Sequence, residues 1–220
     1  MRILALDAAL ARCGAAVVID DRVVAFRLRV GARGHSAELA VMAGEVLAAA
    51  GLTAAQLDGI GVTVGPGSFT GLRAAIALAR GIGLAARVKV VGVTVAEAMA
   101  AALPSLSGRR LWVAIDSRRG RVFLHRGGAP EPTDLAALPA AEGRVAVAGD
   151  AAIAVASRLA ARGDDVMLTD LRLPPLRQIA VVARHRLRGE LAPLEALPLY
   201  VDAPEAKLPA GGLRPHPGPA

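Results

Sequence analysis

Short apolar runs separated by polar turns open the chain, before segments with helical spacing take over. Residues 3–6, 15–19 and 22–30 are apolar or alternate apolar with polar side chains, which predicts three β-strands. The first run ends at Asp7, and an Asp-Asp pair marks the turn between the second and the third. The chain is therefore expected to begin with two consecutive hairpins.

Helical spacing follows, with strands between the helices. Ser36 is a candidate N-cap and Gly51 a candidate stop for the first helix. Between them, Leu39, Met42 and Val46 lie on one helical face. The elements expected next are a short helix at 53–57, a strand at 60–64, a helix to about 86, a strand at 88–93 and a helix capped by Thr94.

A stretch at 103–110 that contains Pro, Gly and Ser is the best candidate for a domain boundary. The elements expected after it are strands at 111–115, 121–125, 145–148 and 166–168, helices at 151–162 and 176–188, and a loop at 127–139. A strand again ends in an aspartate, Asp116, and a turn leads to another strand. This repetition predicts two related α/β lobes, at 1–102 and 103–208, followed by a disordered tail at 209–220.

Composition narrows the class of protein. Hydrophobic residues make up 54% of the chain and aromatic residues only 2%, so small side chains are expected to fill the core. No apolar run is expected to reach the roughly 18 residues of a membrane span, and Asp7 interrupts the opening apolar segment, which argues against a signal peptide. A single cysteine, Cys13, fits a reducing compartment. A cytoplasmic location without a membrane partner is expected.

The net charge of +7 makes nucleic-acid binding one function to consider. The chain has no basic run interleaved with the aromatic side chains that stack on bases. Solvated surface charge is the favoured interpretation, and a dedicated RNA-binding surface remains the alternative. Genuine phosphate contacts would make the affinity for nucleic acid fall steeply with salt.

A glycine-rich loop, VGPGSFTGLR at residues 64–73, joins a predicted strand to a predicted helix. The exposed N–H groups at such a junction can bind an anion. The loop is neither a phosphate-binding Walker loop, because no lysine follows its last glycine, nor a dinucleotide fingerprint, because Gly65, Gly67 and Gly71 have the wrong spacing. In the alternative interpretation the glycines shape a tight turn, and Ser68 or Thr70 caps the helix. The spacing leaves both interpretations open.

The helix expected after this loop consists largely of small residues. Gly81 and Gly83 each cost a helix about 1 kcal/mol relative to alanine, so close approach by another element is expected there. Elsewhere the chemistry is sparse, because the histidines show no metal-ligand spacing. Asp7 and Asp116 could bind magnesium or act as a base, although an aspartate at a strand end more often caps the next turn.

Several segments together resemble one family, the bacterial tRNA threonylcarbamoyladenosine biosynthesis proteins TsaB, also called YeaZ. They are, in order, ILALDAA (3–9), HSAEL (35–39), VGPGSFTGLR (64–73), VVGVTVAEAMA (90–100), AIDSRRGRVF (114–123) and PLYVDAPEAK (198–207). The resemblance implies an α/β chain with a two-lobed actin/Hsp70-like (ribonuclease H-like) fold and mixed sheets.

It also implies a function as a non-catalytic subunit. Such a subunit binds and activates the transferase TsaD, which threonylcarbamoylates the tRNA adenosine next to the anticodon. The ATPase TsaE joins the complex, the subunit alone forms a homodimer through the same helices, and tRNA is reached only through the complex. No cofactor or metal of its own is expected, while ATP and Mg²⁺ are expected in the assembly. The alternative is an ATP-binding phosphotransferase or ATPase of the same fold.

Two departures from enzymes of this fold favour the subunit interpretation. The turn after the first strand reads Asp-Ala-Ala, with no hydroxyl to hold a phosphate, and His35 lacks a second histidine four residues on. The residues expected on partner-binding helix faces are Leu39, Met42, Val46, Leu72, Ala75, Ala79 and Ile82. The residues expected near a nucleotide or anion are Asp7, Gly65, Gly67, Ser68, Thr70, Gly71 and Arg73.

Overall fold

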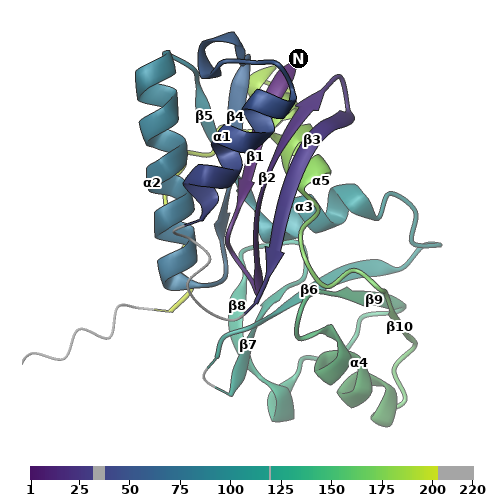
Figure 1. The fold of residues 1–220 in the computed structure, drawn as a ribbon. Helices are drawn as coiled ribbons and strands as arrows, with labels where there is room; N and C mark the ends of the chain where they lie inside the picture. The colour runs from purple at the N-terminus through teal and green to yellow at the C-terminus, as the bar shows by residue number, and fades with distance from the viewer. Residues whose placement is uncertain (32–37, 119, 203–220) are drawn as a thin grey trace, which may run out of the picture.

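The computed structural model describes residues 1–31, 38–118 and 120–202. Within them the chain forms two lobes, each built on a five-stranded sheet (Figure 1). The first lobe contains β1 (Arg2–Asp7), β2 (Arg12–Ile19), β3 (Arg22–Val30), α1 (Leu39–Ala49), η2 (Ala54–Gln56), β4 (Gly59–Gly65), α2 (Phe69–Ala86), β5 (Val90–Thr94) and α3 (Val95–Ala102). Then follow β6 (Arg110–Asp116), β7 (Arg121–His125), β8 (Glu131–Asp134), η3 (Leu135–Ala137), β9 (Val145–Ala148), α4 (Ala152–Ala161), β10 (Val166–Leu168) and α5 (Leu176–Leu187).

The two sheets share one pattern. Their strand orders are β3-β2-β1-β4-β5 and β10-β9-β6-β7-β8. In the first, β1 is antiparallel to β2 and parallel to β4; in the second, β6 is antiparallel to β7 and parallel to β9. Both β1 and β6 end in an aspartate, as the repeated motif predicted. The predicted two-lobed α/β architecture with mixed sheets is confirmed.

Strand β4 illustrates how the sequence positions the helices of the first lobe. Its residues Ile60, Val62 and Val64 enter the core shared with α1 and α2. Its alternate residues face α5, and a Cβ on Gly61 would lie 2.6 Å from Cβ of Ala183. Glycine on that face therefore lets α5 approach the sheet closely. Helices α1 and α2 cover one face of the sheet and α5 covers the other (Figure 1).

Helix ends follow the capping residues. Ser68 accepts a hydrogen bond from Gly71 N–H at the start of α2, and Thr94 forms a capping box with Glu97 at the start of α3. The expected cap of α3 is thus confirmed. The expected cap of the first helix, Ser36, lies outside the described residues, as does His35.

One strand escaped the sequence analysis. Residues 127–139 were expected to form a loop, but β8 lies within them and pairs with β7. Its sequence EPTD has no hydrophobic alternation and contains a proline. Proline is tolerated there because β8 is an edge strand with one side free of ladder hydrogen bonds.

The chain returns to the first lobe after β10. Helix α5 lies in the segment assigned to the second lobe, yet it packs on β1 and β4 of the first. The segment after it also returns to the first lobe, because Leu199 N–H donates to the Val64 carbonyl. The residues assigned to a disordered tail, 209–220, lie outside the described residues.

Helix α2 ends at Ala86 as expected, but it passes a test of length and composition for a membrane span that no apolar run was expected to pass. It has 18 residues and, by length and composition alone, could cross a membrane. Six of its residues are buried in the lobe and two arginines, Arg73 and Arg80, are exposed on its outer side. We therefore interpret α2 as a core helix of an α/β lobe.

Candidate functional site

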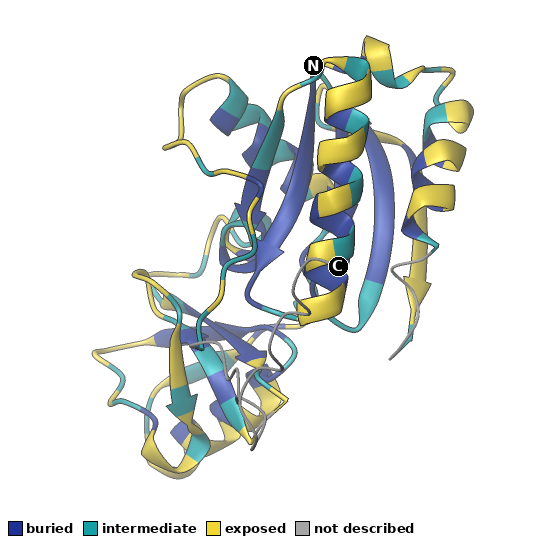
Figure 2. Cartoon of the chain, turned by 90° about the vertical axis from the view of Figure 1, so that its left-hand side faces the viewer, coloured by how far each residue is buried: buried dark blue, intermediate teal, exposed yellow. Residues whose placement is uncertain are grey.

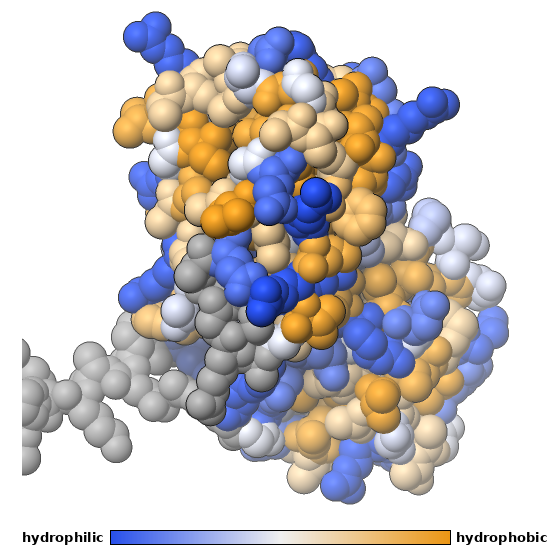
Figure 3. All heavy atoms as spheres, in the orientation of Figure 1, coloured by the Kyte–Doolittle hydropathy of each residue, from blue (hydrophilic) through white to orange (hydrophobic). Residues whose placement is uncertain are grey.

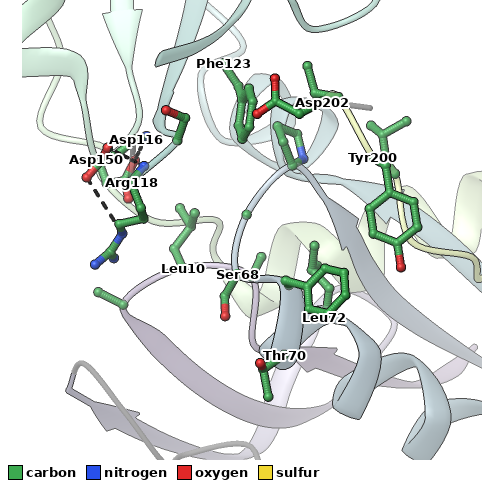
Figure 4. A pocket seen from close by; sticks show the side chains of 18 of the residues that line it. Leu10, Ser68, Thr70, Leu72, Asp116, Arg118, Phe123, Asp150, Tyr200 and Asp202 are labelled. Atoms are coloured by element: carbon green, nitrogen blue, oxygen red, sulfur yellow. Dashed lines mark hydrogen bonds and ion pairs between the residues drawn. The ribbon is translucent and has the colours of Figure 1, made fainter. Parts of the chain in front are cut away.

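A cleft of about 630 Å³ opens between the two lobes (Figure 4). Its walls come from the turn after β1, the glycine loop with the start of α2, the ends of β6 and β9, and the C-terminal segment at 199–202. Four of the residues expected near an anion line it, namely Gly67, Ser68, Thr70 and Arg73. The volume suits a small-molecule ligand.

The glycine loop packs against the turn after β1 instead of surrounding an open space. A Cβ on Gly67 would lie 2.1 Å from the carbonyl oxygen of Ala9, and a Cβ on Gly71 would lie 2.1 Å from that of Ala8. Ser68 N–H donates to the same Ala9 carbonyl at 2.6 Å. These glycines are thus explained by contact between two loops of the chain itself. The geometry favours the structural interpretation of the motif over a phosphate cradle.

Asp7 is buried beside the cleft and does not line it. Its Oδ1 accepts hydrogen bonds from Thr63 Oγ1 at 2.7 Å and from Ala9 N–H at 3.0 Å, and the latter contact caps the turn. Its Oδ2 lies 3.7 Å from the Arg12 guanidinium and accepts no hydrogen bond from any residue that the structure describes. Burial raises the pKa of Asp7, while these hydrogen bonds and Arg12 partly oppose the rise.

Two carboxylates project into the cleft from the second lobe (Figure 4). Asp150 Oδ1 accepts a hydrogen bond from Asp116 N–H at 2.8 Å, and Asp116 Oδ1 accepts one from Arg118 N–H at 2.8 Å. Burial raises the pKa of Asp150, and the Asp116 carboxylate raises it further, against the hydrogen bond from Asp116 N–H. The sequence analysis singled out Asp116 but missed Asp150, which follows β9 without any local motif.

Aromatic side chains gather at the mouth of the cleft. The Arg73 guanidinium lies 3.7 Å from the centre of the Phe69 ring, and its Nε donates to Tyr200 Oη at 2.8 Å. Beside them, Asp202 pairs with Arg121 of the second lobe at 3.2 Å. No local pattern could place Tyr200 beside Phe69 and Arg73, because 127 positions separate Arg73 from Tyr200 along the chain.

The residues predicted to bind a partner lie mostly inside the first lobe. Ile82 is half-buried and the other six are buried, namely Leu39, Met42, Val46, Leu72, Ala75 and Ala79. The helical spacing identified the apolar faces correctly, but those faces pack on the sheet. This prediction is corrected: the six residues form core contacts and are unavailable to a partner.

The opposite faces of α1 and α2 are exposed and still rich in small and apolar residues (Figure 2). We name them the outer helix surface; its residues are Ala40, Val41, Gly44 and Ala48 of α1 with Ala77, Gly81 and Leu84 of α2. Val41 is 62% exposed and Leu84 is 84% exposed. A Cβ on Gly44 or Gly81 would meet no atom within 4 Å, whereas one on Gly83 would lie 2.3 Å from Val90. Packing inside the lobe therefore explains Gly83 and leaves Gly44 and Gly81 unexplained.

Comparison with known proteins assigns the chain to a family. The sequence profile described as TsaD, tRNA N6-adenosine threonylcarbamoyltransferase, matches residues 29–159. The chain belongs to the TsaD family. Within the described residues of this member, no group of three or more His, Cys, Asp or Glu side chains could hold a metal ion.

Two relatives refine that placement in the TsaD family. The tRNA threonylcarbamoyladenosine biosynthesis protein TsaB of Escherichia coli is 34% identical over 124 residues, which cover 56% of this chain and 53% of that protein. YeaZ from Pseudomonas aeruginosa is 26% identical, with a TM-score of 0.73 over 90% of this chain and 99% of that one. The resemblance to TsaB and YeaZ is thereby confirmed. The chain spans about half the length of the curated relatives it matches.

A more distant structure shares only the fold. Component A of (R)-2-hydroxyglutaryl-CoA dehydratase from Acidaminococcus fermentans is 11% identical, with a TM-score of 0.52 over 86% of this chain and 99% of that one. The two-lobed architecture of this TsaD-family member therefore extends beyond proteins with similar sequences.

Proposed function

We propose that this chain is a non-catalytic subunit in tRNA threonylcarbamoyladenosine biosynthesis, which binds and activates a TsaD-type transferase. The proposal rests on membership of the TsaD family together with the TsaB and YeaZ relatives. A TsaE-type ATPase, ATP with Mg²⁺ in the assembly, contact with tRNA only through the complex and a cytoplasmic location belong to the same proposal.

The choice of binding surface rests on two exposed glycines. Gly44 and Gly81 lie inside helices, are exposed and have open space where a Cβ would lie. Each destabilises its helix by about 1 kcal/mol relative to alanine, without a compensating contact in the lobe. A helix of a partner that approaches both backbones closely would account for them, as small residues do where helices pack tightly.

The experiment measures binding to the TsaD homologue from the same source. We expect Gly81→Arg and Val41→Arg to reduce the affinity by at least tenfold, because a long charged side chain would separate the helices. Ile153→Arg is the matched control, since Ile153 is a similarly exposed apolar residue on α4 of the second lobe. Unchanged affinity in both helix variants would refute the outer helix surface. Substitution of Ala75 or Ala79 would not test it, because both are fully buried.

A catalytic function is the second candidate, and the evidence for it is the set of polar residues that line the cleft. Asp116 and Asp150 line the side of the cleft that the second lobe contributes, and Ser68 and Thr70 line the side of the first. These oxygens would suit a phosphate-bound divalent cation. Against this function, the glycine loop is filled by the Ala8 and Ala9 carbonyls. Calorimetric titration of the chain alone with ATP and Mg²⁺ distinguishes the two functions. Binding heat that disappears in Asp150→Asn would support an ATP site in the cleft. The absence of binding heat would favour the subunit proposal.

A further inference from the structure

An apolar cluster joins the two lobes at the floor of the cleft. Leu72 and Met99 of the first lobe belong to it, together with Ile115 and Ala148 of the second. Leu72 also lines the cleft, which places the cluster at the floor. Hydrophilic and hydrophobic side chains are interspersed over both lobes on the face that Figure 3 shows, whereas this cluster is entirely apolar. Because apolar attraction has no preferred direction, the cluster holds the lobes together without selecting one width for the cleft mouth.

The C-terminal segment at 194–202, here called the strap, is bound to the first lobe and leads to the mouth of the cleft (Figure 4). The Leu194 carbonyl accepts a hydrogen bond from Gly92 N–H at 2.8 Å. Further along, Leu199 N–H donates to the Val64 carbonyl at 2.8 Å. Two strands of the first sheet, β5 and β4, thus fix the strap.

The end of the strap reaches the second lobe through one side chain. Asp202 Oδ1 accepts a hydrogen bond from the Arg121 guanidinium at 3.2 Å, and Arg121 is the first residue of β7. Two positions earlier, Tyr200 still contacts the first lobe through Arg73. Among the ion pairs formed between described residues, Arg121–Asp202 is the only one that joins the second lobe to the first lobe or the strap. At the mouth of the cleft, this pair therefore connects the lobes.

This ion pair is exposed enough to break while the fold persists. The side chains of Arg121 and Asp202 are 35% and 23% exposed, so water and dissolved ions compete with the contact. In the apolar floor, by contrast, Leu72 and Ile115 are only 3% and 1% exposed. The two connections between the lobes thus differ, because the floor is shielded from solvent and the pair at the mouth is not.

We propose that the strap is a latch on the cleft. The Arg121–Asp202 pair holds the lobes at the observed width, and loss of the pair lets them tilt apart about the apolar floor, as in hinge motions of other two-lobed proteins. Tyr200, Val201 and Asp202 line the cleft, so a molecule that enters it meets the strap. The latch is independent of the proposed function, and its test needs no partner protein.

Fluorescence energy transfer between the lobes tests the latch. Dyes are attached at two exposed positions of the full chain, Ala77→Cys on α2 and Ser157→Cys on α4, in a Cys13→Ala background. We expect Asp202→Arg to lengthen and broaden the distribution of distances between the dyes, because two arginines then repel each other at the mouth. Exchange of the charges, Arg121→Asp together with Asp202→Arg, should restore the distribution of the parent protein.

The second lobe offers a matched control in another ion pair. Glu131 on β8 pairs with Arg126, the residue after β7, at 3.3 Å. Glu131→Arg should leave the distance distribution unchanged, since this pair lies within one lobe. A distribution in Asp202→Arg equal to that of the parent would overturn the latch. Two other results would also overturn it: a charge exchange that stays as broad as Asp202→Arg, and equal broadening in Glu131→Arg.

Salt gives a second readout that keeps the strap close to its natural sequence. Because dissolved ions screen a partly exposed pair, a rise in salt concentration should broaden the distance distribution of the parent protein. Asp202→Asn, which removes the charge and keeps the size of the side chain, should be broad already at low salt and respond little to added salt. Equal salt responses of the parent and Asp202→Asn would overturn the latch.

Discussion

At the residue scale, the glycines of the loop stabilise the fold because they leave space for neighbouring backbone atoms. The Ala8 and Ala9 carbonyls occupy the positions where a Cβ on Gly71 or Gly67 would lie. The motif thus fixes the contact between the turn after β1 and the start of α2. The glycines are therefore accounted for without a bound ligand.

Substitution of Gly67 should therefore destabilise the chain. We expect Gly67→Ala to lower the free energy of unfolding by about 2 kcal/mol, because the methyl group would force the two loops apart. Urea unfolding followed by circular dichroism measures the change. Gly81→Ala is the control and should raise the stability, since its Cβ would lie in open space. Equal effects of the two substitutions would contradict the loop contact.

Asp7 gives a pH dependence with a definite sign. Its folded pKa is raised above the ordinary value of 3.8, so the folded state binds the proton more tightly than the unfolded state. This contribution to stability is largest at low pH and falls as the pH rises toward the folded pKa. Asp7→Asn should remove that fall. Unfolding of both proteins between about pH 4 and pH 7 measures it, and a contribution that grows with pH would show that Arg12 outweighs burial.

At the scale of elements, the sequence predicted most strands and helices because hydrophobic period and caps are local signals. Strand β10 was expected at 166–168 and lies there, and Thr94 caps α3 as expected. Strand β8 was missed because a polar edge strand has no apolar alternation. The sequence analysis also assigned the apolar helix faces to a partner, whereas they pack on the sheet. Periodicity shows that a face is apolar, but only the tertiary structure shows whether a sheet or a partner covers it.

The outer helix surface yields a prediction with opposite signs in two assays. The double substitution Gly44→Ala and Gly81→Ala should stabilise the isolated chain by about 1 to 2 kcal/mol, because both helices gain propensity. It should weaken binding to the TsaD homologue by roughly tenfold, because two methyl groups would separate the helix backbones. Thermal unfolding and calorimetric titration measure the two effects. Stabilisation without any loss of affinity would contradict a close helix contact.

At the scale of the whole molecule, α5 closes the chain back on the first lobe. Arg186 is 8% exposed, and its guanidinium donates to the Gly92 carbonyl at 2.6 Å and to the Ala192 carbonyl at 2.8 Å. It also pairs with Glu97 of α3. One side chain thus joins α5, β5, α3 and the C-terminal segment. The sequence could not reveal this tie, nor the cleft cluster of Asp150 and Tyr200, because distant segments form them.

Removal of that side chain should affect the whole lobe. We expect Arg186→Met to lower the free energy of unfolding by roughly 3 kcal/mol, because Glu97 and two carbonyls would lose their partner. Arg188→Met is the matched control, since Arg188 is an exposed arginine directly after α5. Denaturant unfolding of both variants measures the difference. Similar stabilities for the two would contradict a central role for Arg186.

Reconstitution tests the central claim most directly. Threonylcarbamoyl transfer from a threonylcarbamoyl adenylate to tRNA would be followed with this chain and the TsaD homologue from the same source, each alone and together. ATP is present throughout, and each mixture is measured with and without the TsaE homologue. We predict transfer only when both proteins are present, and its loss in Gly81→Arg but not in Ile153→Arg. Transfer or ATP turnover by this chain alone, abolished by Asp150→Asn, would contradict the account and place catalysis in the cleft.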